Sequence, residues 1–526
     1  MVTPIDPTVM VSALSRAGYG PRPGEAAEIA VRGFGAWVEQ QLYPKDDPEV
    51  ETRLTALRLR IKYGAAPDGA WAAVDEARPL DLLDRPMEAL WPLADGKTKM
   101  NGAERHRPRD EVVAATLVRA VHSRWQLREV LAGFWHDHFN VDFFQSDTLA
   151  TTLPVYDRAV IRPHCLGNFR KMLEAVATST AMLLYLSNRS SRAGAANENY
   201  GRELFELHTL GRDAYLNDRY DRWRDVPGAK DGKPQGYIDQ DVYEAARAFT
   251  GWTIEDGAGV DGKRRLPETG RFTYVESWHD GYQKRVLATE FAPFAAPQAD
   301  GRQVLDLVAA HPATARHLSA KLVHRLVGEQ PDKLVAAATA EWRKSADAPD
   351  QIARVVRLIL LSPDFMAAKG RRLRRPLALA AAFARATGID LAPSEGLVNA
   401  IAACGQRLFG WPTPTGLPDE DAAFLGTQAM RGRWALLLGL AENWWGTGLP
   451  AAPAALRGTP PTPHTAVAVW LEALGMADRP DVAMAVLTGL GWPPDQVLGL
   501  PAAPDTERKL ARIAALCAMA PAFQGA

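Results

Sequence analysis

The stretch "NENYGRELFELHTLG" (Asn197–Gly211) indicates the fold class, because its residues repeat with the period of an α-helix. At about 100° per residue, its polar and apolar side chains separate onto two neighbouring faces. The polar face holds Asn199, Arg202, Glu203 and Glu206. The apolar face holds Tyr200, Leu204 and Leu207. We therefore predict an amphipathic helix that ends near Gly211, since glycine is common at helix C-termini.

Helical periodicity extends over most of the 526 residues, whereas alternating strand patterns are rare. The segments that carry this periodicity are predicted as helices. They are Pro23–Leu42, Arg109–Ser123, Gln126–Phe139, Asn168–Ser179, Asp241–Thr250, Gly301–Ala310, Pro312–Val327, Asp350–Leu361, Pro376–Ala386 and Asp421–Trp445. The clearest alternating segment, Arg271–Trp278, predicts one arm of a small β-hairpin. The expected fold is therefore mainly α.

Segments rich in Gly and Pro divide the chain. Two of them, Arg212–Gly236 and Glu255–Pro297, are charged and are predicted as long loops of the kind that form lids or binding loops. A Pro/Ala-rich linker is predicted at 448–463. It would separate a large multi-helix body, residues 1–447, which carries the candidate site, from a small helical C-terminal unit, residues 464–526.

Composition excludes several classes of function. The hydrophobic share of 47% and the charged share of 23% are typical of a soluble globular protein. The net charge of −1 gives no overall attraction for nucleic acid, and no such partner is expected. The one basic run, Lys369–Pro376, is predicted as a cationic helix end or loop. No apolar run reaches the ~18 residues of a membrane span.

Cysteine usage and the N-terminus give an expected location. Cys165, Cys404 and Cys517 lie far apart, without metal-ligand spacing, which fits a reduced compartment. The first 25 residues lack a basic segment followed by an apolar one, so no signal peptide is predicted. The chain as given is therefore expected to be cytoplasmic.

Glu203 and Glu206 form the first candidate constellation. Two neighbouring carboxylates repel each other, so a buried pair keeps one proton for acid/base work or binds a cation. The alternative is a solvated face on which Arg202 pairs with Glu206 at i,i+4. His208 lies on another side of the predicted helix, so it joins the pair only where the helix unwinds near Gly211.

The second constellation is "FWHDHFNVDFF" (Phe134–Phe144), which places His136 and His138 among aromatic residues. In an extended segment the two imidazoles share a face and could chelate a metal, whereas in a helix they diverge by about 200°. The alternative to a metal or catalytic role is a pair of buried, hydrogen-bonded core histidines. A weaker third candidate is His279, in a predicted loop beside an Asp and a Lys.

Several motifs occur in the same order as in a known family. They are "SRAGYGPRPGE", "FWHDHFNV", "LGNFRKMLEAVATSTAMLLYLSN", "NENYGRELFELHTLG", "DVYEAARAFTGW", "HDGYQKRVL", "HPATARHLSAKL", "LSPDF" and "GQRLFGWPTPTGLPD". Over about Val11 to Trp445 the sequence thus resembles the large bacterial family DUF1800. The resemblance implies a helical fold, and, because many members are exported, export as an alternative location. It also favours a functional role for the polar motifs.

The leading hypothesis is an enzyme with a polar cleft and hydrolase-type acid/base chemistry on a carbohydrate-like or other hydroxyl-rich substrate. Paired carboxylates beside aromatic residues suit glycoside chemistry. The catalytic candidates are Glu203, Glu206, His136, His138 and Asp241. The substrate-binding candidates are Asn199, Arg202, His208, Trp252 and His279. The expected partner is a small molecule or glycan.

Two alternatives differ in class. The first is a metal-dependent oxidoreductase or hydrolase, because imidazole and carboxylate ligands suit divalent metals such as Zn, Fe or Mn. Its candidate ligands are His136, His138, Glu203 and Glu206. The second is a non-catalytic helical scaffold whose polar residues form a buried network. The sequence assigns neither a cofactor nor an oligomeric state.

Overall fold

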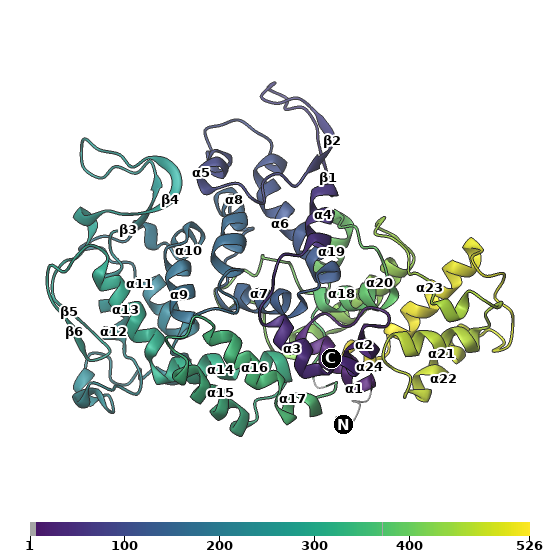
Figure 1. Ribbon diagram of the computed structural model, residues 1–526. Coiled ribbons are helices and arrows are strands. Elements are labelled where there is room, and N and C mark those ends of the chain that lie inside the picture. The colour runs from purple at the N-terminus through teal and green to yellow at the C-terminus, as the bar shows by residue number, and fades with distance from the viewer. Residues whose placement is uncertain (1–6, 371) are drawn as a thin grey trace.

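A computed structural model describes residues 7–370 and 372–526, and within this part of the chain helices dominate (Figure 1). The helices of the first half are α1 (Pro7–Ala17), α2 (Glu25–Arg32), α3 (Phe34–Gln41), α4 (Pro48–Ala56), α5 (Met87–Leu90), α6 (Gly102–His122), α7 (Gln126–His138), α8 (Asp147–Val155), α9 (Phe169–Ala177), α10 (Thr180–Tyr185), α11 (Glu198–Glu203) and α12 (Asp239–Ala248). The mainly α prediction is confirmed.

The second half continues in the same way. Its helices are α13 (Ala299–Ala310), α14 (Pro312–Val327), α15 (Asp332–Lys344), α16 (Gln351–Leu360), α17 (Pro363–Ala367), α18 (Pro376–Thr387), α19 (Glu395–Ala403), α20 (Thr427–Ala441), α21 (Pro463–Ala473), α22 (Pro480–Leu490), α23 (Pro504–Ala518) and α24 (Pro521–Gln524).

Two long helices predicted from the sequence are broken. The expected Pro23–Leu42 helix is divided into α2 and α3 at Gly33, whose φ of 92° is incompatible with a continuing α-helix. The expected Asp421–Trp445 helix is a short 3₁₀ turn, Asp421–Phe424, followed by α20. Apolar periodicity continues across both breaks, so it does not reveal them.

Three antiparallel two-stranded sheets interrupt the helices. The predicted hairpin arm corresponds to β4 (Glu268–Tyr274), which pairs with β3 (Trp252–Asp256). The hairpins β1 (Arg58–Tyr63) with β2 (Val74–Pro79), and β5 (Lys284–Val286) with β6 (Thr289–Phe291), were not predicted. The prediction of a loop over Glu255–Pro297 is therefore wrong. Residues 212–236 do form a long connection, which contains only 3₁₀ turns.

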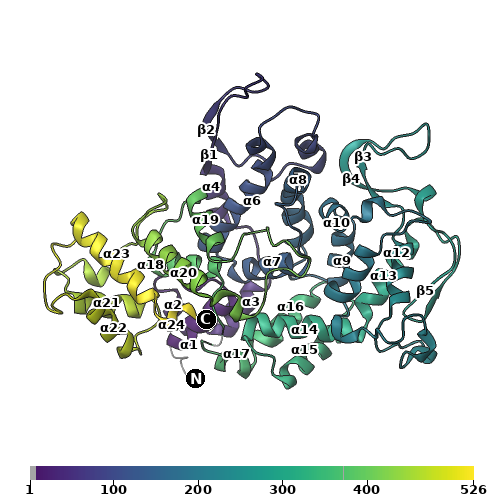
Figure 2. The same ribbon diagram turned by 180° about the vertical axis from the view of Figure 1, so that it is seen from behind.

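Buried side chains gather in two main cores. The first contains Trp135 and Phe169, and it unites helices of the N-terminal and central parts of the chain. The second contains Phe383 and Trp470, and it lies among α6, α18 to α21 and α23. Figure 2 shows these two groups of helices on either side of α6 and α7. Residues where the two cores meet are therefore enclosed without belonging wholly to either.

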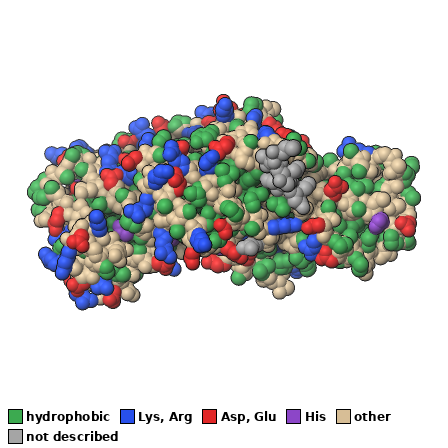
Figure 3. Space-filling model, turned by 60° about the horizontal axis from the view of Figure 1, so that its bottom comes forward, with side chains coloured by type: hydrophobic (Ala, Val, Ile, Leu, Met, Phe, Trp, Pro, Cys, Tyr) green, Lys and Arg blue, Asp and Glu red, His purple; other side chains and the backbone are tan. Residues whose placement is uncertain are grey.

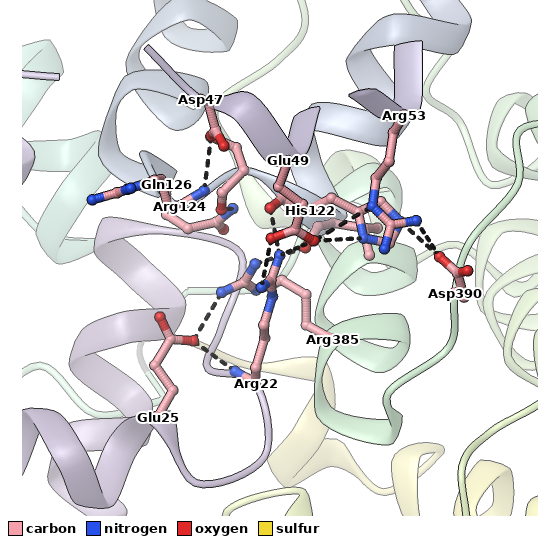
Figure 4. Close-up of polar contacts among 12 residues, drawn as sticks. Arg22, Glu25, Asp47, Glu49, Arg53, His122, Arg124, Gln126, Arg385 and Asp390 are labelled. Atoms are coloured by element: carbon pink, nitrogen blue, oxygen red, sulfur yellow. Dashed lines mark hydrogen bonds and ion pairs between the residues drawn. The ribbon is translucent and has the colours of Figure 1, made fainter. Parts of the chain in front are cut away.

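The turn between α1 and α2 is fixed by a network of charged residues (Figure 4). The guanidinium of Arg385, on α18, donates to the carbonyl oxygens of Gly20 at 2.6 Å and Val121 at 2.7 Å. It also contacts the Glu25 carboxylate at 2.9 Å. One buried side chain thus joins α18, the end of α6 and the turn that carries Tyr19.

The surface mixes charges of both signs. Lys and Arg alternate with Asp and Glu over the face in Figure 3. No helix within the described ranges has the length and apolar run needed to cross a membrane.

The C-terminal helices share their core with the preceding part of the chain. Ile513 on α23 is buried in the same cluster as Leu436 and Leu440 on α20. Beyond them, Oε1 of Gln524 accepts from Nε of Arg433 at 2.8 Å. The division into body, linker and tail stays a prediction, but this shared core makes their stabilities interdependent.

A truncation tests this interdependence. We expect a chain ending at residue 447 to have a markedly lower melting temperature and to aggregate, because it exposes Leu436 and Leu440. Thermal unfolding and light scattering, with the full chain as the reference, measure the effect. A truncated chain that stays monomeric and melts at the temperature of the full chain would show the tail to be an independent domain.

Candidate functional site

Helix α7 carries the histidines of the aromatic segment, and its helical geometry sends them in different directions. Nε2 of His136 lies 3.0 Å from Oδ1 of Asp157, on the π-helical turn Tyr156–Ile161. Nε2 of His138 lies 3.1 Å from the carbonyl oxygen of His208. The extended arrangement in which the two imidazoles chelate together is therefore wrong.

Asp157 belongs to a buried ion cluster. Its Oδ2 accepts from Nε of Arg162 at 2.9 Å and from Nη1 of Arg119 at 3.4 Å. Arg162 also holds Glu129, with Nη2 2.6 Å from Oε2. Burial opposes ionisation of Asp157, but the guanidinium of Arg162 and the imidazole of His136 outweigh it and hold the pKa of Asp157 far below its usual range. Asp157 is therefore a carboxylate that orients His136.

The His136–Asp157 pair lies in the wall of a cavity of about 70 Å³. This cavity lies where the two cores meet, and it also touches Tyr19 and Arg325. Its mouth is at the segment 407–411, because Arg407 is exposed there. Nδ1 of His136 has no hydrogen-bond partner among the described residues. The pair therefore offers an oriented imidazole with a free nitrogen.

The helix of the carboxylate pair is amphipathic, as predicted, but it changes form midway. α11 ends at Glu203, and a π-helical turn, Leu204–His208, follows. The wider turn removes the i,i+4 spacing, so Arg202 does not pair with Glu206. Arg202 instead contacts Asp239 at 3.3 Å, and Glu206 contacts Arg212 at 2.6 Å.

Glu203 is half-buried beside Glu206. Burial, and then the neighbouring Glu206 carboxylate, raise the pKa of Glu203. This agrees with the predicted electrostatics of the pair. Neither residue lines the cavity or a larger open hollow of about 1170 Å³ beside α13 and α14. The catalytic role of Glu203 and Glu206 thus stays a prediction, apart from these two hollows.

His208 lies in the interior rather than at a ligand surface. It is 0% exposed, and neither ring nitrogen has a hydrogen-bond partner. It lies beside His138, whose Nδ1 is 3.1 Å from Nζ of Lys321, and His317 is nearby on α14. Burial lowers the pKa of His208 to about 3 and that of His317 to about 4, and it lowers the pKa of His138 strongly. The prediction that His208 contacts a substrate is therefore wrong.

Three other candidates have structural partners. Asp241 is 5% exposed, and its carboxylate accepts from the backbone N–H groups of Ile238 at 3.0 Å and Leu287 at 2.7 Å. Burial raises the pKa of Asp241 to about 6. Through these two backbone hydrogen bonds, Asp241 links the start of α12 to the β5–β6 turn. Its carboxylate is therefore not a free acid.

Trp252 and His279 also stabilise the fold. Trp252 is 0% exposed and packs edge-on against Phe249, so it cannot stack on a ligand as predicted. Nδ1 of His279 lies 2.9 Å from the carbonyl oxygen of Thr250, and its Nε2 lies 3.3 Å from Oδ2 of Asp300. His279 thus links the turn between α12 and β3 to α13.

The remaining polar residues of the opening stretch also contact the protein. The side-chain amide of Asn199 donates to the carbonyl oxygen of Leu186 at 3.4 Å. Among the residues the structure describes, no group of three or more His, Cys, Asp or Glu side chains is arranged to hold a metal ion. The four predicted ligands, His136, His138, Glu203 and Glu206, therefore do not form one site.

Sequence reasoning missed the partners that give His136 its geometry. Asp157 and Arg162 lie in "YDRAVIR" (Tyr156–Arg162), where charges interrupt an apolar helical stretch. Arg375 was assigned to a cationic helix end, but it lies in the cavity wall. Arg371, in the same basic run, lies outside the described residues. Charged residues within an otherwise apolar helical pattern were the signal that could have identified these residues.

Comparison with known proteins identifies a family whose function is unknown. A family model described as "Protein of unknown function (DUF1800)" matches residues 12–525, nearly the whole chain. No curated protein and no solved structure matches.

The neutral histidine cluster predicts a pH dependence of stability. A histidine of the unfolded chain titrates near ~6.5, above the folded values, so the unfolded state takes up protons first as the pH falls. We expect the free energy of unfolding to decrease below about pH 6.5 and His208→Phe to flatten that slope by roughly 1.4 kcal/mol per pH unit. Urea unfolding at about pH 7.5 and about pH 5 measures it.

The matched control is His464→Phe, because His464 is exposed. It should leave the slope unchanged. Equal slopes in the wild type and His208→Phe would mean that His208 is not held neutral in the folded protein.

Proposed function

The chain belongs to the DUF1800 family of proteins of unknown function, and from that premise we propose that it is an enzyme of the hydrolase type with His136 as its acid/base group. The observation that carries the proposal is the 3.0 Å contact between His136 and the ionised Asp157 in a cavity wall. A histidine oriented by a carboxylate is a recurring arrangement for general acid/base catalysis.

The hydrogen bond assigns a tautomer to His136. Asp157 as a carboxylate only accepts, so the proton of the neutral imidazole lies on Nε2. Nδ1 then has a free lone pair, which can accept a proton from water or from a substrate hydroxyl. Asp157 would stabilise the imidazolium that forms, and Arg162 keeps Asp157 ionised. His136 would subsequently return the proton to the leaving group.

The surroundings of the cavity favour a hydroxyl-rich substrate. At its mouth, the half-buried indole of Trp411 offers an apolar surface, and Asn140 lies in the same wall. A cavity of about 70 Å³ accommodates only part of a sugar-sized molecule, so the remainder would lie at the mouth. Trp411 takes the aromatic role that the sequence assigned to Trp252.

His136→Asn tests the proposal, because the asparagine amide still donates to Asp157 but cannot accept a proton. We expect hydrolysis to fall by roughly 10²–10⁴-fold with the fold retained. The assay is a panel of nitrophenyl glycosides, carboxylic esters, phosphates and sulfates, with circular dichroism as the check on folding.

The control is His106→Asn. His106 pairs with Asp147 at 2.8 Å, a similar His–Asp contact at the surface. It should keep the wild-type rate. Equal rates in wild type and His136→Asn on every substrate that is turned over would contradict the proposal. No turnover of any substrate by the wild type would favour the non-catalytic scaffold.

A second candidate uses the carboxylate pair. The raised pKa of Glu203 favours a protonated acid beside the carboxylate of Glu206, which Arg212 holds at 2.6 Å. If this surface is catalytic, Glu203→Gln lowers nitrophenyl glycoside hydrolysis by about 10²–10⁴-fold while His136→Asn does not. Glu198→Gln, on the same helix, is the control. A wild-type rate in Glu203→Gln rejects this candidate.

A further inference from the structure

The charges in the cavity wall are almost fully paired. Glu129 and Asp157 share Arg162, as described above. Asp137 contacts Arg375, whose Nη2 also lies 2.7 Å from Oδ1 of Asp419. Every carboxylate that lines the cavity thus has a guanidinium partner.

Two cations of the wall lack an ion pair among the described residues: Arg407, which is exposed and lies over the ring of Phe144, and Arg325, which is partly buried. The guanidinium of Arg325 lines the cavity, yet it makes no hydrogen bond or ion pair with any described residue, and its Nε is buried without an acceptor. Burial, and then the guanidinium of Arg375 nearby, lower the pKa of Arg325. Arg325 is a partly buried cation that makes no ion pair of its own, because the nearby carboxylates of Asp137 and Asp419 pair with Arg375. Such a cation is unfavourable, so this position favours a bound anion.

Tyr19 adds a second donor in the same cavity. Its backbone N–H donates to Oε1 of Gln126 at 2.9 Å, which fixes the residue at the end of α1. Its hydroxyl has no hydrogen-bond partner among the described residues. Burial raises the pKa of Tyr19 to about 12, so the hydroxyl keeps its proton and donates at neutral pH. Arg325, Tyr19 and His136 therefore present unused polar groups to one space.

We propose that this cavity binds a small oxyanion, a carboxylate, sulfate or phosphate group, through the guanidinium of Arg325 and the hydroxyl of Tyr19. Its volume of about 70 Å³ is far below the roughly 300–1,000 Å³ of pockets that enclose drug-sized ligands, which fits such a small group better than a sugar ring. Guanidinium and hydroxyl donors suit oxyanions. The substrate would then be an acidic hydroxyl-rich molecule, a statement that rests on the proposed function.

Anion binding can be measured without a substrate. Thermal unfolding is followed in phosphate, sulfate or acetate, each titrated against chloride at equal ionic strength. We expect at least one of the three oxyanions to raise the melting temperature of the wild type saturably. Arg325→Gln should weaken that binding by roughly tenfold or more, and Tyr19→Phe by less. The anion with the largest effect identifies the group.

Two further variants exclude trivial explanations. Arg325→Met removes the charge but keeps an apolar side chain, so it should melt at or above the wild-type temperature without anion and show no anion response. Arg354→Gln, an exposed arginine that contacts Asp350 at 2.8 Å, should respond like the wild type. An unchanged anion response in Arg325→Gln, or no response in the wild type, would overturn the proposal.

The failure of this inference and the failure of the proposed function give different results. His136-dependent hydrolysis without an oxyanion effect would reject the anion site and leave the enzyme. Binding that depends on Arg325, without any turnover that depends on His136, would keep the anion site and reject the enzyme.

Discussion

The bridge that Arg162 makes between Glu129 and Asp157 is the interaction on which the site depends. Two carboxylates are buried where the two cores meet, and isolated charges there would strongly destabilise the fold. One guanidinium satisfies both, at 2.6 Å and 2.9 Å. It fixes α7 against the π-helical turn at Tyr156–Ile161 and gives His136 an ionised partner. The cavity lies beside this bridge.

Helix α7 places its two histidines in contrasting surroundings because successive helical positions point in different directions. His136 faces a carboxylate and a cavity, which suits proton transfer. His138 is buried beside Lys321 and another histidine, and its burial and then the charge of Lys321 lower its pKa, so it is held neutral. The same five-residue sequence thus places one histidine in the wall of a cavity and one in the interior. The cavity beside His136 also holds the guanidinium of Arg325, which lacks an ion pair among the described residues.

Local sequence patterns predicted the helices because apolar periodicity is a local property. They did not predict the break at Gly33, where one glycine with a positive φ ends the helix although the apolar periodicity continues. They identified His136 through its aromatic neighbours, but Asp157 and Arg325 approach it only in the folded chain. Trp252 and Asp241 were assigned to the site because an indole can stack on a substrate and a carboxylate can transfer a proton. Tertiary packing buries both, and no local pattern records that.

The most direct measurement is a crystal structure of the protein soaked with selenate, in which the anomalous signal of selenium locates the anion. We expect one strong peak in the cavity, within hydrogen-bond distance of the guanidinium of Arg325 and the hydroxyl of Tyr19, with Nε2 of His136 still on Asp157. A cavity that contains only water, or an Arg325 side chain paired with a carboxylate, would contradict this description of the site.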